Sequence, residues 1–340
     1  MPVGGDLCLE IAQKEHKKET VLSVRNLATH FFLKEGTSKV LDGVDFHLEK
    51  GETLALMGES GSGKTVTALS ILKLIAPSGK IVSGEVIFNG KDILKMKQSQ
   101  IRKIRGKGIT LISQEPMSSL NPSWTIGHQI IEAIEINQGI KGIEAKNKAL
   151  EMLRLVRIPS PESMINSYPY EFSGGMKQRV MIAMGLSCRP QILIADEPTA
   201  SLDVTIQAQI LELMKLLKKE IGTTIFLITN NLGVVAEMAD RVVIIYAGQV
   251  VEVGNVFDIF HKPAHHYTKG IVKTVMELKD KSKRLEVIKG EPPNSMNPPA
   301  GCRFNPRCQF ARDICRKEKP DYKKIEGSAG RWVRCYFPLE

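Results

Sequence analysis

Long apolar runs are missing from this 340-residue sequence. No stretch approaches the ~20 consecutive apolar residues that a membrane-spanning helix requires. The first twenty residues, MPVGGDLCLEIAQKEHKKET, also lack the basic start, apolar middle and small-residue cleavage site of a signal peptide. These two absences argue against a membrane-spanning or secreted chain and predict a soluble protein of the cytoplasm.

Aromatic residues are few, at 6% of the sequence, whereas Lys and Arg outnumber Asp and Glu by 47 to 37 and give a net charge of +10. The basic segments KQSQIRKIRGK and KDKSKRLEVIK lack the interleaved aromatics of a surface that binds single-stranded nucleic acid. The charge therefore favours a solvated face, or one apposed to an anionic membrane, over a nucleic-acid site. No nucleic-acid partner is expected.

Cysteine is scarce and unevenly placed, since four of the six cysteines lie in the last forty residues. A disulfide pair, a zinc site, an iron–sulfur cluster and chance are all compatible with this crowding. The length of the chain exceeds what one hydrophobic core usually holds. We therefore expect either one large domain with an appendage or two domains.

The segment TLALMGESGSGKT, residues 53–65, contains the pattern G-x-x-x-x-G-K-[ST] at Gly58, Gly63, Lys64 and Thr65. The apolar run before it predicts a buried strand, and TVTALSILKLI after it has helical spacing. A strand, a glycine-rich loop and a helix in this order are typical of a phosphate-binding loop. The alternative is a plain glycine-rich turn.

The predicted chemistry of this loop is specific. Glycines let successive backbone N–H groups surround phosphate oxygens, and the following helix offers its positive N-terminus to the same anion. Lys64 is expected to reach the β- and γ-phosphates of ATP, and Thr65 to ligate Mg²⁺. The predicted ATP-binding residues of the loop are Gly58, Glu59, Ser60, Gly61, Ser62, Gly63, Lys64, Thr65 and Val66.

A second apolar run in QILIADEPTASLD predicts another buried strand, which ends in the acidic pair Asp196 and Glu197. One carboxylate beside bound Mg²⁺ can hold the metal, and the next can take a proton from attacking water. We assign Asp196 to the metal and Glu197 to the proton. The alternative for such a pair is a solvated turn.

The segment EFSGGMKQRVMIAMGL begins a predicted helix with Ser173, Gly174 and Gly175. Serine at a helix start followed by two glycines gives a second place where N–H groups can face a phosphate. Taken alone, this tripeptide is more typical of a plain helix cap. Its position shortly before the acidic strand favours the phosphate.

These motifs resemble, in type and order, those of the ATP-binding cassette (ABC) family, over roughly residues 21–260. The family implies an α/β fold: a RecA-like core, an antiparallel β subdomain and a helical subdomain inserted at about 116–179. It implies an N-terminal extension at 1–20 and a cysteine-containing C-terminal extension at 261–340. The matching motifs are the phosphate loop, a glutamine loop at Gln114, the signature Ser173 to Gln178, the pair Asp196 and Glu197, and the D-loop Ser201, Leu202 and Asp203.

The resemblance also implies roles for residues in a head-to-tail dimer, in which each ATP lies between one subunit's phosphate loop and the other's signature. Phe31 would stack on adenine, with Phe32 as the substitute. The implied catalytic residues are Glu197, Gln114 and Asn230, and the implied Mg²⁺ ligands are Thr65, Gln114 and Asp196. Asp203 belongs to the implied D-loop. The signature residues that would contact the partner's ATP are Ser173, Gly174, Gly175, Met176 and Gln178.

Further segments resemble the ATPase subunits of bacterial dipeptide and oligopeptide importers, namely SQEPMSSLNPSWTIGHQI, FSGGMKQRV, LGVVAEMADRVVIIYAGQVVE and HHYTKG. The resemblance implies a peripheral location at the cytoplasmic face of the cell membrane. It implies a second, different ABC ATPase subunit, two transmembrane permease subunits and, indirectly, an extracytoplasmic peptide-binding protein as partners. The alternatives are import of nickel or another solute, and a soluble cassette ATPase that acts on nucleic acid or ribosomes.

The importer ATPases carry a C-terminal extension with the arrangement PPxGCxF…RC…C…C, which Cys302, Cys308, Cys315 and Cys335 match. Disulfides are disfavoured among the reducing thiols of the cytosol. Structural zinc sites favour C-x2-4-C, whereas these gaps are five, six and nineteen residues. Four thiolates can hold a [4Fe–4S] cluster. The cluster is expected as a cofactor beside ATP and Mg²⁺, with zinc or unliganded thiols as alternatives.

The other cysteines, Cys8 and Cys188, fit no ligand pattern and are interpreted as ordinary thiols. The histidines His261, His265 and His266 are not spaced as paired ligands on one helix face, so a structural turn is favoured over a metal site.

The sequence departs from the family at one functional position, after the predicted strand TTIFLIT. The family usually places His-Asp there, with the histidine touching the γ-phosphate, whereas this chain has Asn230 and Asn231. An asparagine amide can donate a hydrogen bond, but it is shorter than imidazole and carries no positive charge. Slow hydrolysis is therefore expected at the site built on this chain's own phosphate loop.

Overall fold

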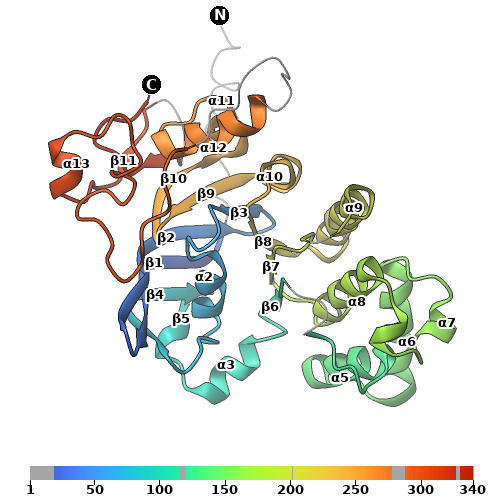
Figure 1. The fold of residues 1–340 in the computed structure, drawn as a ribbon. Coiled ribbons are helices and arrows are strands. Elements are labelled where there is room, and N and C mark those ends of the chain that lie inside the picture. Colours follow the sequence, from blue (N-terminus) through green and yellow to red (C-terminus); the bar gives the residue numbers. More distant parts are fainter. Residues whose placement is uncertain (1–18, 115–118, 201, 278–287, 327–329, 340) are drawn as a thin grey trace, which may run out of the picture.

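The computed structural model describes residues 19–114, 119–200, 202–277, 288–326 and 330–339. They form two sheets, a helical layer and a C-terminal segment that returns to the larger sheet (Figure 1). Residues 1–18, which include Cys8, and most of the charged stretch before residue 288 lie outside the described residues.

The larger sheet has the strand order β11-β12-β10-β9-β3-β8-β7-β6. Its central strands are parallel, and β3, β7 and β8 are buried along their whole length, as expected for a sheet covered on both faces. The bounds are β3 Thr53–Met57, β6 Ile109–Ile112, β7 Ile192–Asp196, β8 Thr224–Thr229, β9 Arg241–Tyr246, β10 Gln249–Asn255, β11 Lys323–Lys324 and β12 Trp332–Val333.

The smaller sheet is antiparallel, with the order β2-β1-β4-β5. Its strands are β1 Thr20–Leu33, β2 Gly36–Glu49, β4 Gly79–Phe88 and β5 Lys91–Asp92. Side chains from β1, β2 and β4 share one hydrophobic core with Ala68 and Ile71 of helix α2 (Lys64–Ile71) and with Leu54 and Leu56 of β3. This core fixes the helix after the phosphate loop against both sheets.

The remaining helices lie between and after the strands. Those between β6 and β7 are α5 Ile126–Gln138, α6 Gly142–Leu155, α7 Pro161–Met164 and α8 Gly174–Ser187, with the 3-10 turn η2 at Pro169–Glu171. The others are η1 Ile93–Lys95, α3 Gln98–Ile104, α9 Val204–Ile221, α10 Leu232–Met238, α11 Val256–His261, α12 His266–Glu277 and α13 Asp313–Lys317.

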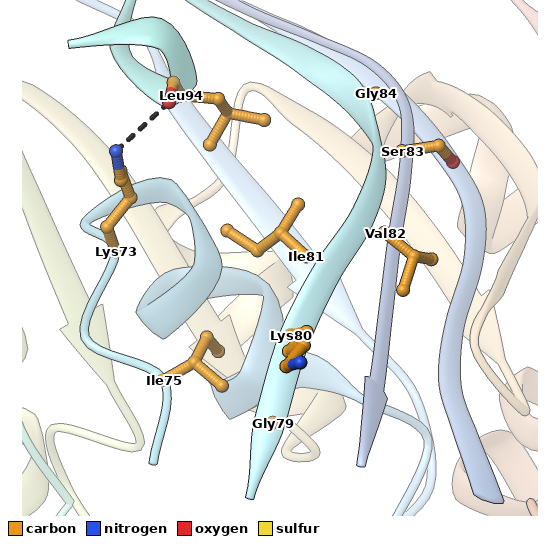
Figure 2. Close-up of a pocket in the computed structure, with 9 residues that line it drawn as sticks. All are labelled: Lys73, Ile75, Gly79, Lys80, Ile81, Val82, Ser83, Gly84 and Leu94. Carbon is orange, nitrogen blue, oxygen red and sulfur yellow. Dashed lines mark hydrogen bonds between the residues drawn. The ribbon is translucent and has the colours of Figure 1, made fainter. Parts of the chain in front are cut away.

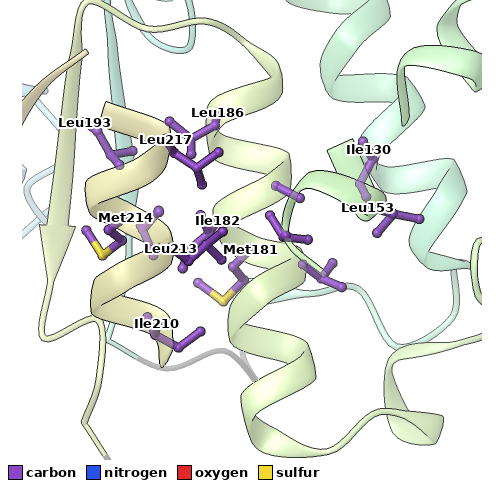
Figure 3. Packing of buried hydrophobic residues seen from close by; sticks show 14 of the residues in the cluster. Ile130, Leu153, Met181, Ile182, Leu186, Leu193, Ile210, Leu213, Met214 and Leu217 are labelled. Carbon is purple, nitrogen blue, oxygen red and sulfur yellow. The ribbon is translucent and has the colours of Figure 1, made fainter. Parts of the chain in front are cut away.

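Helix α8 lies at the centre of the helical layer. Figure 3 shows Met181, Ile182 and Leu186 of α8 beside Leu213 and Leu217 of α9, with side chains of α5 and α6 on the other side. The same core reaches β7 and β8, so one hydrophobic core connects the signature helix with the strand that ends in Asp196.

The C-terminal extension is part of the main sheet, a feature that the sequence analysis did not foresee. Strand β12 pairs antiparallel with β10, which places Val333 opposite Glu252. The fully buried Glu252 accepts hydrogen bonds from the backbone N–H groups of Ala264 and His265 and from Arg331 at 3.1 Å. A buried carboxylate with three donors anchors the returning segment firmly.

Candidate functional site

Residues 58–63 form a loop between β3 and α2, as the phosphate-loop motif predicts. The ammonium group of Lys64 donates to the carbonyl oxygens of Gly58 at 2.8 Å and Glu59 at 3.1 Å, so it lies inside the curve of the loop. A side chain at Gly58 would collide with the carbonyl oxygen of Ile245, and Gly63 has a φ of +104°. Only glycine satisfies both positions without strain.

Three carboxylates lie near the Lys64 ammonium. Burial lowers the pKa of Lys64, and the charges of Glu197, Asp196 and Glu59 oppose that shift in this order. The phosphate loop and the acidic pair therefore form one site, although they are separated by more than a hundred residues of sequence.

Asp196 is the last residue of β7, and its side chain has the environment of a metal ligand. The hydroxyl of Thr65 hydrogen-bonds to the Asp196 carboxyl, while burial raises the pKa of that carboxyl. Among the described atoms, Asp196 Oδ1 is buried and has no hydrogen-bond partner. Buried polar atoms are normally satisfied. A hydroxyl beside an unpaired carboxylate oxygen fits the oxygen ligands that Mg²⁺ prefers.

Glu197 follows β7 with a φ of +47°, an uncommon conformation for this residue. Its Oε2 accepts from the Thr229 hydroxyl at 3.0 Å, and its Oε1 accepts from the backbone N–H of Asn230 at 3.0 Å. Burial raises the pKa of Glu197, which makes the carboxylate a better proton acceptor near neutral pH.

Both asparagines after β8 have defined places. Asn230 is exposed, and its backbone N–H is the group that contacts Glu197. Asn231 caps α10, because its Oδ1 accepts from the N–H groups of Gly233 at 2.9 Å and Val234 at 3.3 Å. The capping role was not predicted, although the following apolar helix gave the signal for it.

Gln114 and the two phenylalanines predicted to stack on adenine lie on other elements than the phosphate loop and the acidic pair. Gln114 is exposed two residues after β6, and residues 115–118 of the glutamine loop lie outside the described residues. Phe31 is partly buried against Gly79, whereas Phe32 is 49% exposed with the Lys80 ammonium 5.7 Å from its ring centroid.

The signature residues lie at the start of α8, apart from this chain's phosphate loop. Ser173 is the exposed N-cap and accepts from the backbone N–H of Met176 at 3.4 Å. A side chain at Gly175 would approach Ile206 of α9 to 2.7 Å. Gln178 is buried, and its Nε2 has no partner among the described atoms.

The D-loop aspartate, Asp203, is the N-cap of α9 and accepts from the Ile206 N–H at 3.0 Å. Ser201 lies outside the described residues. Helix α8 packs on β6 and α9, whereas α2 packs on β1, β2, β7 and β8. The phosphate loop and the signature are thus followed by helices that pack on different strands, and α8 and α2 are well separated in Figure 1.

The four C-terminal cysteines converge on one small pocket of about 20 Å³, which is room for about one water molecule. His265 and His266 line the same pocket, a juxtaposition that sequence spacing did not indicate. Burial raises the pKa of the Cys302 thiol to about 11 and also raises those of Cys308 and Cys335. Within the described ranges, no group of three or more His, Cys, Asp or Glu side chains is arranged to hold a metal ion. The four thiols of the expected cluster therefore line one pocket, but the described side chains are not arranged as the ligands of a metal.

The other singled-out side chains have structural surroundings. His265 is fully buried in the turn before α12, where its Nδ1 accepts from the Tyr267 N–H at 3.1 Å. Its pKa is lowered by burial to about 3, so the ring is neutral. Cys188 is buried at the end of α8, and burial raises the pKa of its thiol.

A groove of about 530 Å³ runs beside β4 on the smaller sheet. Figure 2 shows Ile75, Lys80 and Ile81 along this groove and the hydrogen bond from Lys73 to the Leu94 carbonyl at its edge. None of the predicted site residues lines it, so the groove is not part of the candidate site.

Comparisons with known proteins identify the family. The sequence profile of the ABC transporter family matches residues 41–200, and that of the C-terminal region of oligopeptide/dipeptide transporters matches residues 251–315. A probable peptide ABC transporter ATP-binding protein of Sinorhizobium fredii is 49% identical over 92% of this chain and 94% of the relative. The oligopeptide transport ATP-binding protein AppD of Bacillus subtilis is 49% identical, and the dipeptide transport ATP-binding protein DppD of Escherichia coli is 41% identical. Both alignments cover 94% of this chain and 97% of the relative. The chain belongs to the oligopeptide/dipeptide ABC transporter ATP-binding proteins.

Solved structures confirm the predicted fold class of this ABC ATPase. The ATP-binding cassette MJ0796, in a dimeric post-hydrolysis state bound to ADP and Pi, matches with a TM-score of 0.62 and 28% identity over 69% of this chain and 98% of that chain. The cbiO1 protein of Clostridium perfringens, part of the cbiONQ ABC transporter complex, matches with a TM-score of 0.63 and 26% identity over 78% of this chain and 97% of that chain.

The described part of this ABC ATPase contains no helix that combines the length and the apolar character needed to cross a membrane.

Proposed function

We propose that this chain is the ATP-hydrolysing subunit of an importer for dipeptides or oligopeptides, located peripherally at the cytoplasmic face of the cell membrane. The observation that carries the proposal is the similarity to relatives named as peptide transport ATP-binding proteins, which covers 94% of the chain. The match of residues 251–315 to the C-terminal region of oligopeptide/dipeptide transporters supports it. The proposed partners are a second ABC ATPase, two transmembrane permease subunits and, indirectly, a peptide-binding protein outside the membrane.

The proposed chemistry uses the residues gathered at the ends of β3 and β7. Backbone N–H groups of residues 58–63 and the Lys64 ammonium bind the phosphates of ATP. Thr65, Asp196 and Gln114 would hold Mg²⁺, which neutralises charge on the phosphates when it is bound. Glu197, held by Thr229 and the Asn230 N–H, accepts the proton of the attacking water.

A second cassette completes the site in this proposal. The exposed Ser173 and Gly174 lie on a layer that does not pack on α2, which supports their use at a partner's ATP. Because Asn230 offers a shorter side chain without positive charge, the site on this chain's phosphate loop hydrolyses slowly. If the second cassette carries the histidine that Asn230 replaces in this chain, the site completed by this chain's signature performs most of the turnover.

The domain organisation proposed from the sequence is an N-terminal extension at 1–20, a nucleotide-binding domain at 21–260 with its helical subdomain at about 116–179, and an extension at 261–340. We propose that Cys302, Cys308, Cys315 and Cys335 bind a [4Fe–4S] cluster, because all four thiols line one pocket. Zinc and unliganded thiols are the alternatives. Protein purified without oxygen should be brown with roughly four irons per chain; stoichiometric zinc without iron would reverse the ranking.

The test of the transport function is peptide uptake by the assembled transporter in vesicles loaded with ATP. Lys64→Ala should abolish ATP-dependent uptake, because no other residue of the loop supplies a cation to the phosphates. Lys95→Ala is the matched control, since Lys95 is exposed and pairs with Asp92 and Glu85 on the surface. ATP-dependent uptake that is unchanged in Lys64→Ala, or uptake of nickel instead of peptide, would overturn the assignment.

A further inference from the structure

The C-terminal extension contacts the phosphate loop directly, through the segment between the first two cysteines of the pocket. Arg307, the residue before Cys308, donates to Oε2 of Glu59 at 2.8 Å. Glu59 is the second residue of the phosphate loop. The two side chains are separated by 248 residues of sequence, so no local pattern brings them together.

Arg307 is held rigidly enough to position its partner. Its guanidinium also donates to the Tyr246 hydroxyl at 3.2 Å and to the backbone carbonyl oxygens of Lys289 at 3.2 Å and Ile288 at 3.4 Å. Its side chain is 7% exposed. A guanidinium with four fixed acceptors is preorganised, so it presents its charge to Glu59 in one geometry.

The backbone of the loop is held by the same cluster of side chains. The N–H of Glu59 donates to the Tyr267 hydroxyl at 3.0 Å. The ring of Tyr267 packs against Tyr246 and against Phe304, which lies between the first two cysteines, with ring centroids 4.6 and 5.5 Å apart. The segment 302–308 thus reaches both the side chain and, through Tyr267, the main chain of one phosphate-loop residue.

A carboxylate in a phosphate-binding loop is unfavourable for a polyanionic ligand unless a cation neutralises it. The Glu59 side chain is 27% exposed, so water screens its charge only in part. Arg307 supplies the neutralising charge. If Arg307 only packed against the phosphate loop, its effect on ATP binding would not depend on whether residue 59 is charged.

We propose that Arg307 is a positioning residue for ATP binding, which neutralises Glu59 and thereby lets the C-terminal extension hold the phosphate loop ready for nucleotide. The inference rests on the proposed role of residues 58–65 in binding ATP. It gives the cysteine-containing extension a function in the nucleotide cycle that does not require electron transfer.

The experiment measures the Kd for Mg²⁺-ATP and the KM and kcat of hydrolysis in the purified full chain and the assembled transporter. Arg307→Gln should weaken ATP binding about tenfold, which corresponds to about 1.4 kcal/mol. In the Glu59→Gln background, adding Arg307→Gln should weaken ATP binding by no more than about twofold, because the carboxylate that Arg307 neutralises is absent. The loss should appear in KM more than in kcat.

Arg303→Gln is the matched control. Arg303 lies in the same segment, is 6% exposed and pairs with Asp42 of β2 at 2.7 Å, outside the phosphate loop. It should change ATP binding by no more than about twofold. Metal content, measured in every variant, separates an effect on the loop from an effect on the cysteine pocket.

Arg307→Lys keeps the charge and should bind ATP better than Arg307→Gln, which covers the case in which the glutamine variant folds poorly. The proposal is overturned if Arg307→Gln behaves like Arg303→Gln, if Glu59→Gln fails to restore binding in the double variant, or if the lysine and glutamine variants are equally weak. Lys64→Ala is measured alongside, because normal ATP binding in that variant would overturn the proposed ATP site itself and not the role of Arg307.

Discussion

Replacement of Glu197 by glutamine isolates the proton-accepting step from nucleotide binding. Glutamine has the same shape, and it can keep both contacts of the native side chain. Its carbonyl oxygen can accept from the Asn230 N–H, and its amide can donate to the Thr229 hydroxyl in place of the bond that Oε2 accepts at 3.0 Å. The loop geometry should therefore survive, including the φ of +47° at this residue.

The expected loss is in the rate of hydrolysis alone. A positioned general base contributes about 10²- to 10⁴-fold, so kcat at this site should fall by that factor while the Kd for ATP stays within about twofold. The burial that raises the pKa of Glu197 also sets the pH profile. The carboxylate must be unprotonated to act, so the native rate should rise with pH and level off above a pKa higher than that of an ordinary glutamate.

The assay is single-turnover hydrolysis in the assembled transporter, with the equivalent glutamate of the partner already replaced, so that only this chain's site contributes. The acidic limb of the pH profile should vanish in Glu197→Gln. Thr229→Val is a milder control, because it removes the hydrogen bonds of the Thr229 hydroxyl with Glu197 and with the Asn231 N–H but keeps the base. A fall of less than about tenfold, or a pH profile that is unchanged in shape, would refute the role of Glu197 as the base.

Three further expectations follow from particular contacts. Asn230→His should raise the rate of hydrolysis at this chain's site by up to about 10²-fold in the same single-turnover assay. A preorganised hydrogen-bond donor at the developing phosphate charge typically accelerates the reaction by about that factor. Asp196→Asn should raise the Tm of the nucleotide-free chain at neutral pH yet lose stabilisation by Mg²⁺-ATP in thermal melts. The raised pKa means that the folded state favours the protonated carboxyl, so stability present at low pH is lost as pH rises through that pKa. Arg331→Ala should lower the free energy of unfolding by about 3–5 kcal/mol in urea titrations, because it removes the ion-pair partner of the buried Glu252. A loss below about 1 kcal/mol would contradict a stabilising role for this ion pair.

The sequence predicted the parts of the site in which a local pattern and a local geometry coincide. The apolar run 53–57, the glycines after it and the helix beginning at Lys64 specify strand, loop and helix within thirteen residues, and the structure has each in place. Asp196 and Glu197 follow in the same way from the end of a buried strand.

The unpredicted features depend on contacts between distant segments. No periodicity connects Arg307 with Glu59, or the histidines before α12 with the cysteines of the extension. Strand β12 has two residues, so it is too short to show an alternating pattern of apolar and polar residues. Its place beside β10 depends on the contact of Arg331 with the buried Glu252.

The place of β3 in the larger sheet has a consequence for biosynthesis. The strand that carries the phosphate loop lies between β8 and β9, which are made about 170 residues later in translation. A nascent chain that has exposed only residues 53–65 has no strand on either side of β3, and pairings of such long sequence separation form slowly. The ATP site therefore matures only after residue 246 has left the ribosome, and any chain interrupted before that point carries the motif without the pocket.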